Sequence, residues 1–395
     1  MPFDAGDFPD LPLPERGQTR ANRRSIALWL FVLCGMIWVM VVLGGLTRLT
    51  GSGLSIMEWA PIAGTLPPLD HTQWEKLFHL YQQIPQYKLL NQGFGLAGFQ
   101  RIFWLEFIHR LWGRLLGIAV LGPMAWFWWR GRLPRWLIAR LIGFFLLGGL
   151  QGAVGWFMVS SGFFADATAV APARLVIHLG LAVALYAMIL WTALTVWPDA
   201  PPQGPDRPWL RRAVTLVVGL TALTILAGGF VAGTHAGFEY NSFPLMGGRL
   251  VPRGYARLHP FLRNLTQNLA AVQFDHRLLA TLTAAATLAA LGLALGPGVA
   301  RRARQAVLVL AGFVALQYAL GVSTLLLVVP VPLASAHQAN AVLVLTVGLV
   351  ALRRLRRGPG QPHGAQAGAA DQETAAGSVP GDPAVVPPAS RRRSP

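Results

Sequence analysis

The stretch Glu106-Phe107-Ile108-His109-Arg110 opens one of the long apolar runs of this chain. A glutamate and a histidine three positions apart share one face of a helix. Ionisable side chains at membrane depth cost about 2.5–3.5 kcal/mol each on insertion scales, so they are candidates for function. The pattern recurs as Gln273-Phe274-Asp275-His276-Arg277 at the start of another apolar run, and two further histidines, His178 and His337, lie early in other runs. The sequence therefore contains four histidines of apolar runs in two matched pairs.

The composition is that of a polytopic membrane protein. The chain has 395 residues, of which 54% are hydrophobic and only 12% charged, and its mean hydropathy is +0.48. The net charge of +17 comes from arginines clustered between apolar runs, which indicate membrane topology and no nucleic-acid partner. The single cysteine, Cys34, excludes an internal disulfide, a CxxC site and a covalent CxxCH haem site.

The apolar runs predict an all-α integral membrane protein with eight transmembrane helices. Each run approaches or exceeds the roughly 20 residues needed to cross the hydrocarbon core. The predicted spans lie near residues 25–46, 107–129, 138–160, 173–197, 210–233, 269–295, 304–328 and 333–352.

Arginine-rich short connections predict the orientation. They all fall on the same side as the amino terminus, so we expect that side to be cytoplasmic and the long connections, 47–105 and 234–268, to face outward. Residues 1–24 are expected to form a cytoplasmic tail, 198–208 a cytoplasmic linker and 353–395 a disordered cytoplasmic tail. The short amino terminus, which does not resemble a cleavable signal, favours a bacterial plasma membrane.

The two halves of the chain repeat. Leu43-Gly44-Gly45 matches Ala227-Gly228-Gly229, and Leu150-Gln151-Gly152-Ala153-Val154-Gly155 matches Leu316-Gln317-Tyr318-Ala319-Leu320-Gly321. We therefore predict two tandem pseudo-symmetric four-helix bundles, over 25–197 and 209–352. Because four spans is an even number, the halves share an orientation, and the repeat axis should run along the membrane normal.

The histidines are candidate iron ligands. Under this topology His109, His178, His276 and His337 each fall within the first two turns of a span that enters from the outer side. Two imidazoles that face each other across a bundle suit axial ligation of a haem iron. Carboxylate and thiolate partners for a closed zinc site are sparse. The alternative is that each histidine only forms an interhelical hydrogen bond.

Arginines near the outer side are candidates for binding haem propionates, because guanidinium groups form bidentate contacts with carboxylates. The alternative for each of them is ordinary anchoring at the membrane interface. The candidates are Arg48, Arg110, Arg249, Arg253 and Arg277.

The halves differ where Glu106 of the first is replaced by Gln273 in the second. A carboxylate beside a metal-bound cofactor acts as a base or stabilises positive charge, and an amide does neither in the same way. We therefore predict that the chemistry takes place in the first half, beside a spectator or electron-relay haem in the second. The alternative is that Glu106 and Arg110 form a structural ion pair.

Six segments together resemble the haem A synthase family, and the match covers about residues 25–352. They are Gly-Gly-Leu-Thr-Arg-Leu-Thr-Gly-Ser-Gly-Leu-Ser at 44–55, Glu-Phe-Ile-His-Arg at 106–110, Gln-Gly-Ala-Val-Gly-Trp at 151–156, His-Leu-Gly-Leu-Ala at 178–182, Asp-His-Arg at 275–277 and Ala-His-Gln-Ala-Asn at 336–340.

The resemblance implies an eight-span enzyme that oxidises the C8 methyl group of haem O to the formyl group of haem A, by two hydroxylations and a dehydration. It implies that His276 and His337 ligate a resident haem b, and that His109 and His178 hold haem O with Glu106 essential nearby. The pathway implies a handover from haem O synthase, contact with oxidase assembly factors and possible homo-oligomers. Cysteine pairs that some members carry in their outer loops are absent from this chain.

Two functions of other classes remain open from the residues alone. One is a bis-histidine b-type cytochrome that passes electrons from quinol without transforming haem. The other is a haem carrier, which needs no second matched iron site.

Overall fold

Eight long helices dominate the computed structural model, which describes residues 19–60, 63–164, 167–198 and 207–355. Each is long and apolar enough to cross a membrane. Within the described ranges no strand occurs beyond an isolated bridge between Met246 and Arg249, so the all-α, eight-span prediction is confirmed. The helices are α1 (Arg20–Leu49), α4 (Leu96–Trp129), α5 (Arg135–Ser160), α6 (Pro172–Val196), α7 (Pro208–Thr234), α9 (Leu269–Leu295), α10 (Arg301–Leu326) and α11 (Val331–Arg354).

Local sequence explains where several helices begin. The Thr19 side chain accepts a hydrogen bond from the backbone N–H of Asn22 at the start of α1, and Asn268 caps α9 in the same way. Proline occupies the first turn of α6, α7 and α11, where its missing N–H costs no helical hydrogen bond. Of the predicted tails, Arg20–Arg24 belong to α1 and Arg353–Arg354 to α11, while residues 1–18 and 356–395 and most of the predicted linker (199–206) lie outside the described residues.

The long connections contain shorter helical pieces. After α1 come a 3₁₀ turn at Ala63–Thr65, α2 (His71–Tyr81) and α3 (Pro85–Leu90). Between α7 and α9 come 3₁₀ turns at Ala236–Phe238 and Phe261–Arg263, followed by α8 (Asn264–Gln267).

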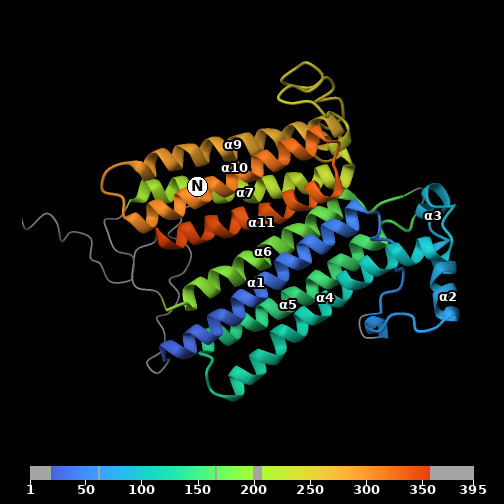
Figure 1. Cartoon of the computed structure of the whole chain (residues 1–395), viewed down its shortest axis with the longest axis horizontal. Helices are drawn as coiled ribbons and strands as arrows, with labels where there is room; N and C mark the ends of the chain where they lie inside the picture. The colour runs from blue at the N-terminus through green and yellow to red at the C-terminus, as the bar shows by residue number, and fades with distance from the viewer. Residues whose placement is uncertain (1–18, 61–62, 165–166, 199–206, 356–395) are drawn as a thin grey trace, which may run out of the picture. The chain divides into compact units, whose positions relative to one another are not determined.

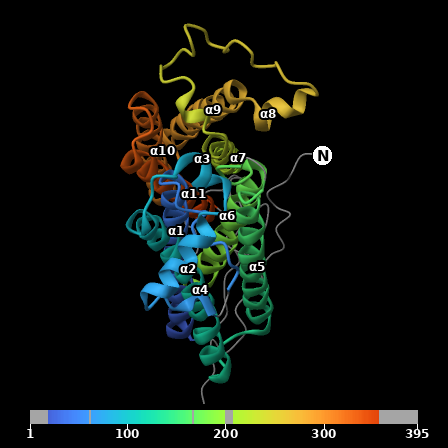
Figure 2. The ribbon, with the colours of Figure 1, turned by 90° about the vertical axis from the view of Figure 1, so that its right-hand side faces the viewer.

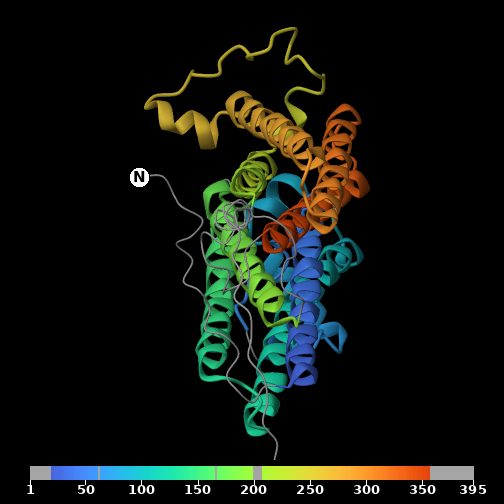
Figure 3. The ribbon, with the colours of Figure 1, turned by 90° about the vertical axis from the view of Figure 1, so that its left-hand side faces the viewer.

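The contacts between long helices fall into two sets of four. In the first half α1 and α5 each pack against α4 and α6, and in the second half α7 and α10 each pack against α9 and α11. The three views show each set side by side (Figures 1, 2 and 3). The arrangement is consistent with two tandem four-helix bundles, which meet where α6 contacts α7 and where α11 contacts α1 and α6.

Close packing and hydrogen bonds join the two halves. The Trp38 indole of α1 donates to the Ala339 carbonyl of α11 over 2.9 Å, and the Gln338 amide of α11 donates to the Val41 carbonyl of α1 over 2.7 Å. A Cβ at Gly45 would overlap the Gln338 side chain. At the matched position of the second half, a Cβ at Gly229 would lie 3.0 Å from Val176 of α6. Small residues therefore permit close helix approach at both junctions.

Two structural details differ from the sequence-based expectation. α4 begins at Leu96, eleven residues before the predicted span, and this extension buries Phe99, Ile102 and Phe103 against residues of α2 and the turn after it. The prediction that all four histidines lie within two turns of a helix start is wrong for His109, the fourteenth residue of α4. The extension contains the polar residues Gln100, Arg101 and Glu106, so it is not part of an apolar run and the sequence pattern did not predict it.

Candidate haem-binding sites

His276 and His337 face each other in the second half. They belong to α9 and α11, their ring centroids are 6.4 Å apart and their planes are nearly perpendicular, at 86°. A metal–imidazole bond is about 2 Å long, so two rings on opposite sides of one metal have centroids roughly 6 Å apart. The observed separation fits that requirement. Nδ1 of His276 lies 3.2 Å from the Thr224 carbonyl, and when it donates there Nε2 is left to bind a metal.

The corresponding couple in the first half consists of His109 of α4 and His178 of α6, which stand at the matched positions of the repeat. Nδ1 of His178 is buried without a hydrogen-bond partner. Both rings are half-buried, as are those of His276 and His337. The facing rings of His276 and His337 agree with the predicted pairing in the second half, and the role of all four histidines as iron ligands stays a prediction.

Each of the four imidazoles packs against a glycine of a neighbouring helix. A Cβ added at these glycines would come within 2.9–3.1 Å of a ring atom, closer than real Cβ contacts allow at the short end of that range. The pairs are Gly44 with His109, Gly155 with His178, Gly228 with His276, and Gly321 with His337. These glycines are the ones that the sequence repeat matches, and the missing side chains are what leave room for the rings.

A pair of glutamines, Gln151 of α5 and Gln317 of α10, reaches the second histidine of each couple. Gln151 Nε2 donates to the His178 carbonyl over 2.9 Å and lies 3.5 Å from His178 Nε2. Gln317 Nε2 lies 3.2 Å from His337 Nδ1 and 3.5 Å from its Nε2. Sequence reasoning used both glutamines as signs of the repeat but assigned them no role.

Glu106 is held as a hydrogen-bond acceptor in the wall of the first bundle, where only 3% of it is exposed. Its Oε2 accepts hydrogen bonds from the Ser55 hydroxyl (2.7 Å) and the Ile56 N–H (2.9 Å) of the loop after α1. Its Oε1 accepts two hydrogen bonds from the Arg110 guanidinium, at 2.6 and 3.0 Å. The Glu106–Arg110 ion pair considered from the sequence is therefore present.

Gln273 occupies the matched place on α9 and faces a loop of opposite polarity. Its Nε2 donates to the Tyr240 carbonyl over 3.1 Å, and its Oε1 has no partner. The loop after α1 presents N–H and O–H groups to a carboxylate, whereas the loop after α7 presents a carbonyl to an amide. The residue types at 106 and 273 thus agree with their surroundings.

The candidate propionate-binding arginines divide into three kinds. Arg110 and Arg277 donate to loop carbonyls, of Ile56 and Glu58 in the first half and of Tyr240 and Ser242 in the second. Arg48 donates to the Ala232 carbonyl and to His235 Nε2, both over 2.6 Å, where the ends of α1 and α7 meet. Arg249 and Arg253 lie exposed in the connection between α7 and α9.

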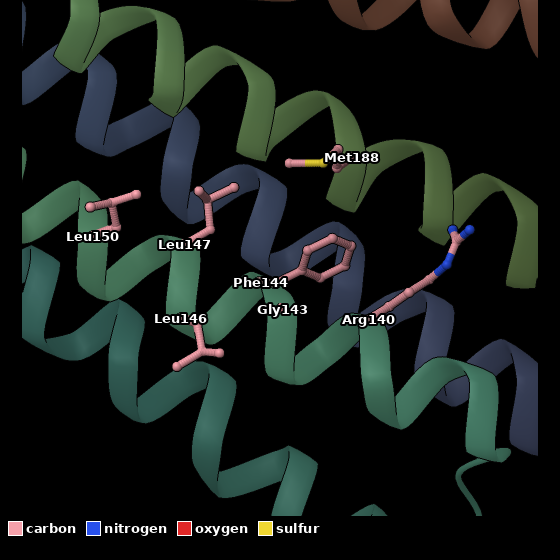
Figure 4. Close-up of a pocket in the computed structure, with 7 residues that line it drawn as sticks. All are labelled: Arg140, Gly143, Phe144, Leu146, Leu147, Leu150 and Met188. Atoms are coloured by element: carbon pink, nitrogen blue, oxygen red, sulfur yellow. The ribbon is translucent and has the colours of Figure 1, made fainter.

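A surface hollow of about 510 Å³ lies between α5 and α6 (Figure 4). Its lining is almost wholly apolar, from Phe144, Leu147, Leu150 and Met188 among others, with Arg140 at one end. None of the candidate iron ligands lines it.

Comparison with known proteins points to one family. Residues 27–349 match the COX15-CtaA family, described as cytochrome oxidase assembly protein. The chain is 59% identical over 335 residues to the Heme A synthase of Granulibacter bethesdensis, covering 85% of this chain and 88% of that protein. It is 46% identical over 352 residues to the Heme A synthase of Rhodospirillum centenum, covering 89% and 94% of the two chains. The chain belongs to the COX15-CtaA family of cytochrome oxidase assembly proteins.

Proposed function

We infer that this chain is a haem A synthase, an integral membrane oxidoreductase that converts haem O to haem A. The observation that carries the inference is a pair of matched histidine couples that differ at one position, where the first has the buried carboxylate of Glu106 and the second the amide of Gln273. Two histidine couples with the same neighbouring residue would suit a bis-histidine cytochrome equally well. A single buried acid–base group at one couple suits an enzyme with one reacting and one supporting centre.

The second-half couple, His276 and His337, holds a resident haem b in this proposal. The centroid separation of 6.4 Å and the glycines behind both rings fit such a group. When bound, this haem supplies a one-electron relay. The hydrogen bond from His276 Nδ1 to the Thr224 carbonyl fixes the ring and leaves Nε2 as the ligating atom.

The first-half couple, His109 and His178, holds the substrate haem O. The unpaired Nδ1 of His178 and the glycine at each ring support this assignment. Guanidinium groups at the loop end of the bundles, from Arg48, Arg110 and Arg277, are candidates for the propionates. Arg249 and Arg253, which lie exposed in the connection between α7 and α9, are further candidates.

Glu106 is the proton acceptor. The net change at the substrate is R–CH₃ + H₂O → R–CHO + 4 H⁺ + 4 e⁻, in which two hydroxylations by water give a geminal diol that loses one water. Glu106 takes up a proton from the attacking water or stabilises cationic character on the substrate carbon. Arg110 and Ser55 donate hydrogen bonds to its two carboxyl oxygens and so fix its position, and the four electrons leave singly to an electron acceptor of the membrane.

Partners and place in the cell follow from the same proposal. The substrate arrives from a farnesyl-transferring haem O synthase and the product passes to oxidase assembly factors, with the chain in a bacterial plasma membrane and both termini cytoplasmic. A homo-oligomer is compatible with this arrangement.

Extraction and chromatography of the pigments of the purified protein test the function. We expect haem O or haem A together with haem B. Haem B alone, with no conversion of added haem O, would instead indicate the electron-transferring cytochrome.

A further inference from the structure

The matched glutamines, Gln151 and Gln317, differ in what their amide oxygens contact. Gln317 Oε1 accepts a hydrogen bond from Asn340 Nδ2 over 2.9 Å. Asn340 Nδ2 also donates to the Phe313 carbonyl over 3.2 Å. Asn340 therefore fixes the orientation of the Gln317 amide. Gln151 Oε1 is buried and has no hydrogen-bond partner.

The sequence gives a local reason for this difference. Asn340 stands three residues after His337, whereas Leu181 stands three residues after His178. A leucine side chain has no donor, so nothing on α6 occupies the Gln151 oxygen as Asn340 on α11 occupies that of Gln317. The difference lies beside the second ligand of each couple and is independent of the exchange of Glu106 for Gln273.

The Gln151 amide nitrogen is already engaged, since it donates to the His178 carbonyl over 2.9 Å. That bond leaves the oxygen as the free end of the amide. A buried acceptor without a donor is unfavourable until a ligand or a water supplies one. The oxygens of Glu106, in contrast, already accept hydrogen bonds from Ser55, Ile56 and Arg110. Beside the first histidine couple, Gln151 therefore offers an acceptor that is open, whereas Glu106 does not.

We propose that Gln151 contacts the substrate and that its Oε1 accepts a hydrogen bond from the hydroxyl group formed at the substrate methyl. This inference rests on the proposed function and adds to it. A methyl group donates no hydrogen bond to Oε1, whereas the alcohol made from it does. Gln151 thus stabilises the bound alcohol over the bound substrate and retains it for the second oxidation.

Replacement of Gln151 by leucine tests this role in the full-length protein, purified with its haems. We expect Gln151→Leu to raise the ratio of hydroxymethyl to formyl haem in chromatographed extracts about tenfold, the usual size of one lost hydrogen bond. The absorption spectrum should still show haem at both centres.

A second variant leaves Gln151 itself in place. Leu181→Asn introduces the asparagine amide that the second half has at Asn340. Its N–H should donate to Gln151 Oε1 in place of the substrate hydroxyl, so the ratio of hydroxymethyl to formyl haem should rise as it does in Gln151→Leu. The matched control is Leu146→Ala on the same helix as Gln151, because this side chain is 65% exposed, and the change should leave that ratio as in the wild type.

A wild-type ratio in both Gln151→Leu and Leu181→Asn would overturn the proposal and indicate that only water occupies the Gln151 oxygen. A wild-type protein that makes no formyl haem from haem O would instead overturn the proposed function. The two failures are therefore distinguishable.

Discussion

Glu106 and Gln273 occupy matched positions in the two halves but face different groups. The loop at Glu106 offers a hydroxyl and an N–H, and Arg110 adds two more donors, so the carboxylate is stabilised where it lies. The loop at Gln273 offers the Tyr240 carbonyl, which would repel a carboxylate. The groups that face each side chain thus suit a carboxylate at 106 and an amide N–H at 273.

Replacing Glu106 by glutamine should therefore separate chemistry from binding. The amide keeps the size of the side chain but accepts no proton, so we expect Glu106→Gln to retain haem while haem A formation falls by about 10²–10⁴-fold. Haem A formed per protein is the measurement, and the same change at the exposed Glu58 of the neighbouring loop is the control. Wild-type turnover of Glu106→Gln would remove Glu106 from the mechanism.

The close contact between a glycine and each imidazole leads to a second prediction about a single residue. A Cβ at Gly321 would lie 2.9 Å from Cε1 of His337, so alanine there forces the ring to move. We expect Gly321→Ala to lower the amount of haem b bound per protein, measured from its absorption. Gly312→Ala on the same helix is the control, because nothing lies within 4 Å of its added Cβ. Equal haem contents in the two variants would contradict a ligand role for His337.

At the scale of elements, the ends of α1 and α7 form a contact that depends on pH. Burial and the nearby Arg48 lower the pKa of His235 from its ordinary value of 6.5. His235 Nε2 lies 2.6 Å from Arg48 Nη2 and accepts from it only when neutral. The unfolded chain therefore binds more protons than the folded one below about pH 6.5, and stability falls as the pH drops from there toward the lower folded pKa.

Thermal unfolding between pH 7.5 and 5 checks this contact. The melting temperature should fall on acidification in the wild type, and it should fall less in His235→Asn, since asparagine tolerates the left-handed backbone at this position and does not titrate. Parallel curves for the two proteins would mean that His235 does not contribute.

Elements were predictable to different degrees from the sequence. Seven spans follow their apolar runs within a few residues, because hydrophobic length decides a bilayer crossing. The early start of α4 was missed, since its extension is stabilised by α2 and not by lipid. The repeat and the histidine pairing could be recognised from motifs. The partners of Gln151 and Gln317 could not, because they depend on side-chain positions across helices.

At the scale of the whole molecule, the junction between the halves carries the next prediction. A side chain at Gly45 would overlap Gln338 of α11 and disturb its hydrogen bond to the Val41 carbonyl. Overpacking of this kind typically costs about 1–3 kcal/mol. We expect Gly45→Leu to lower the melting temperature and the haem content of both halves. Gly35→Leu on the same helix, where nothing lies within 4 Å of the added Cβ, should do neither.

The adjacent glycines of α1 have a mechanical consequence. A Cβ at Gly44 would lie 3.1 Å from the His109 ring, and one at Gly45 would overlap Gln338, the residue that follows His337. Neighbouring residues of one helix therefore lie against segments that carry a histidine of each half. A shift of α1 along or about its axis would change the surroundings of both segments at once.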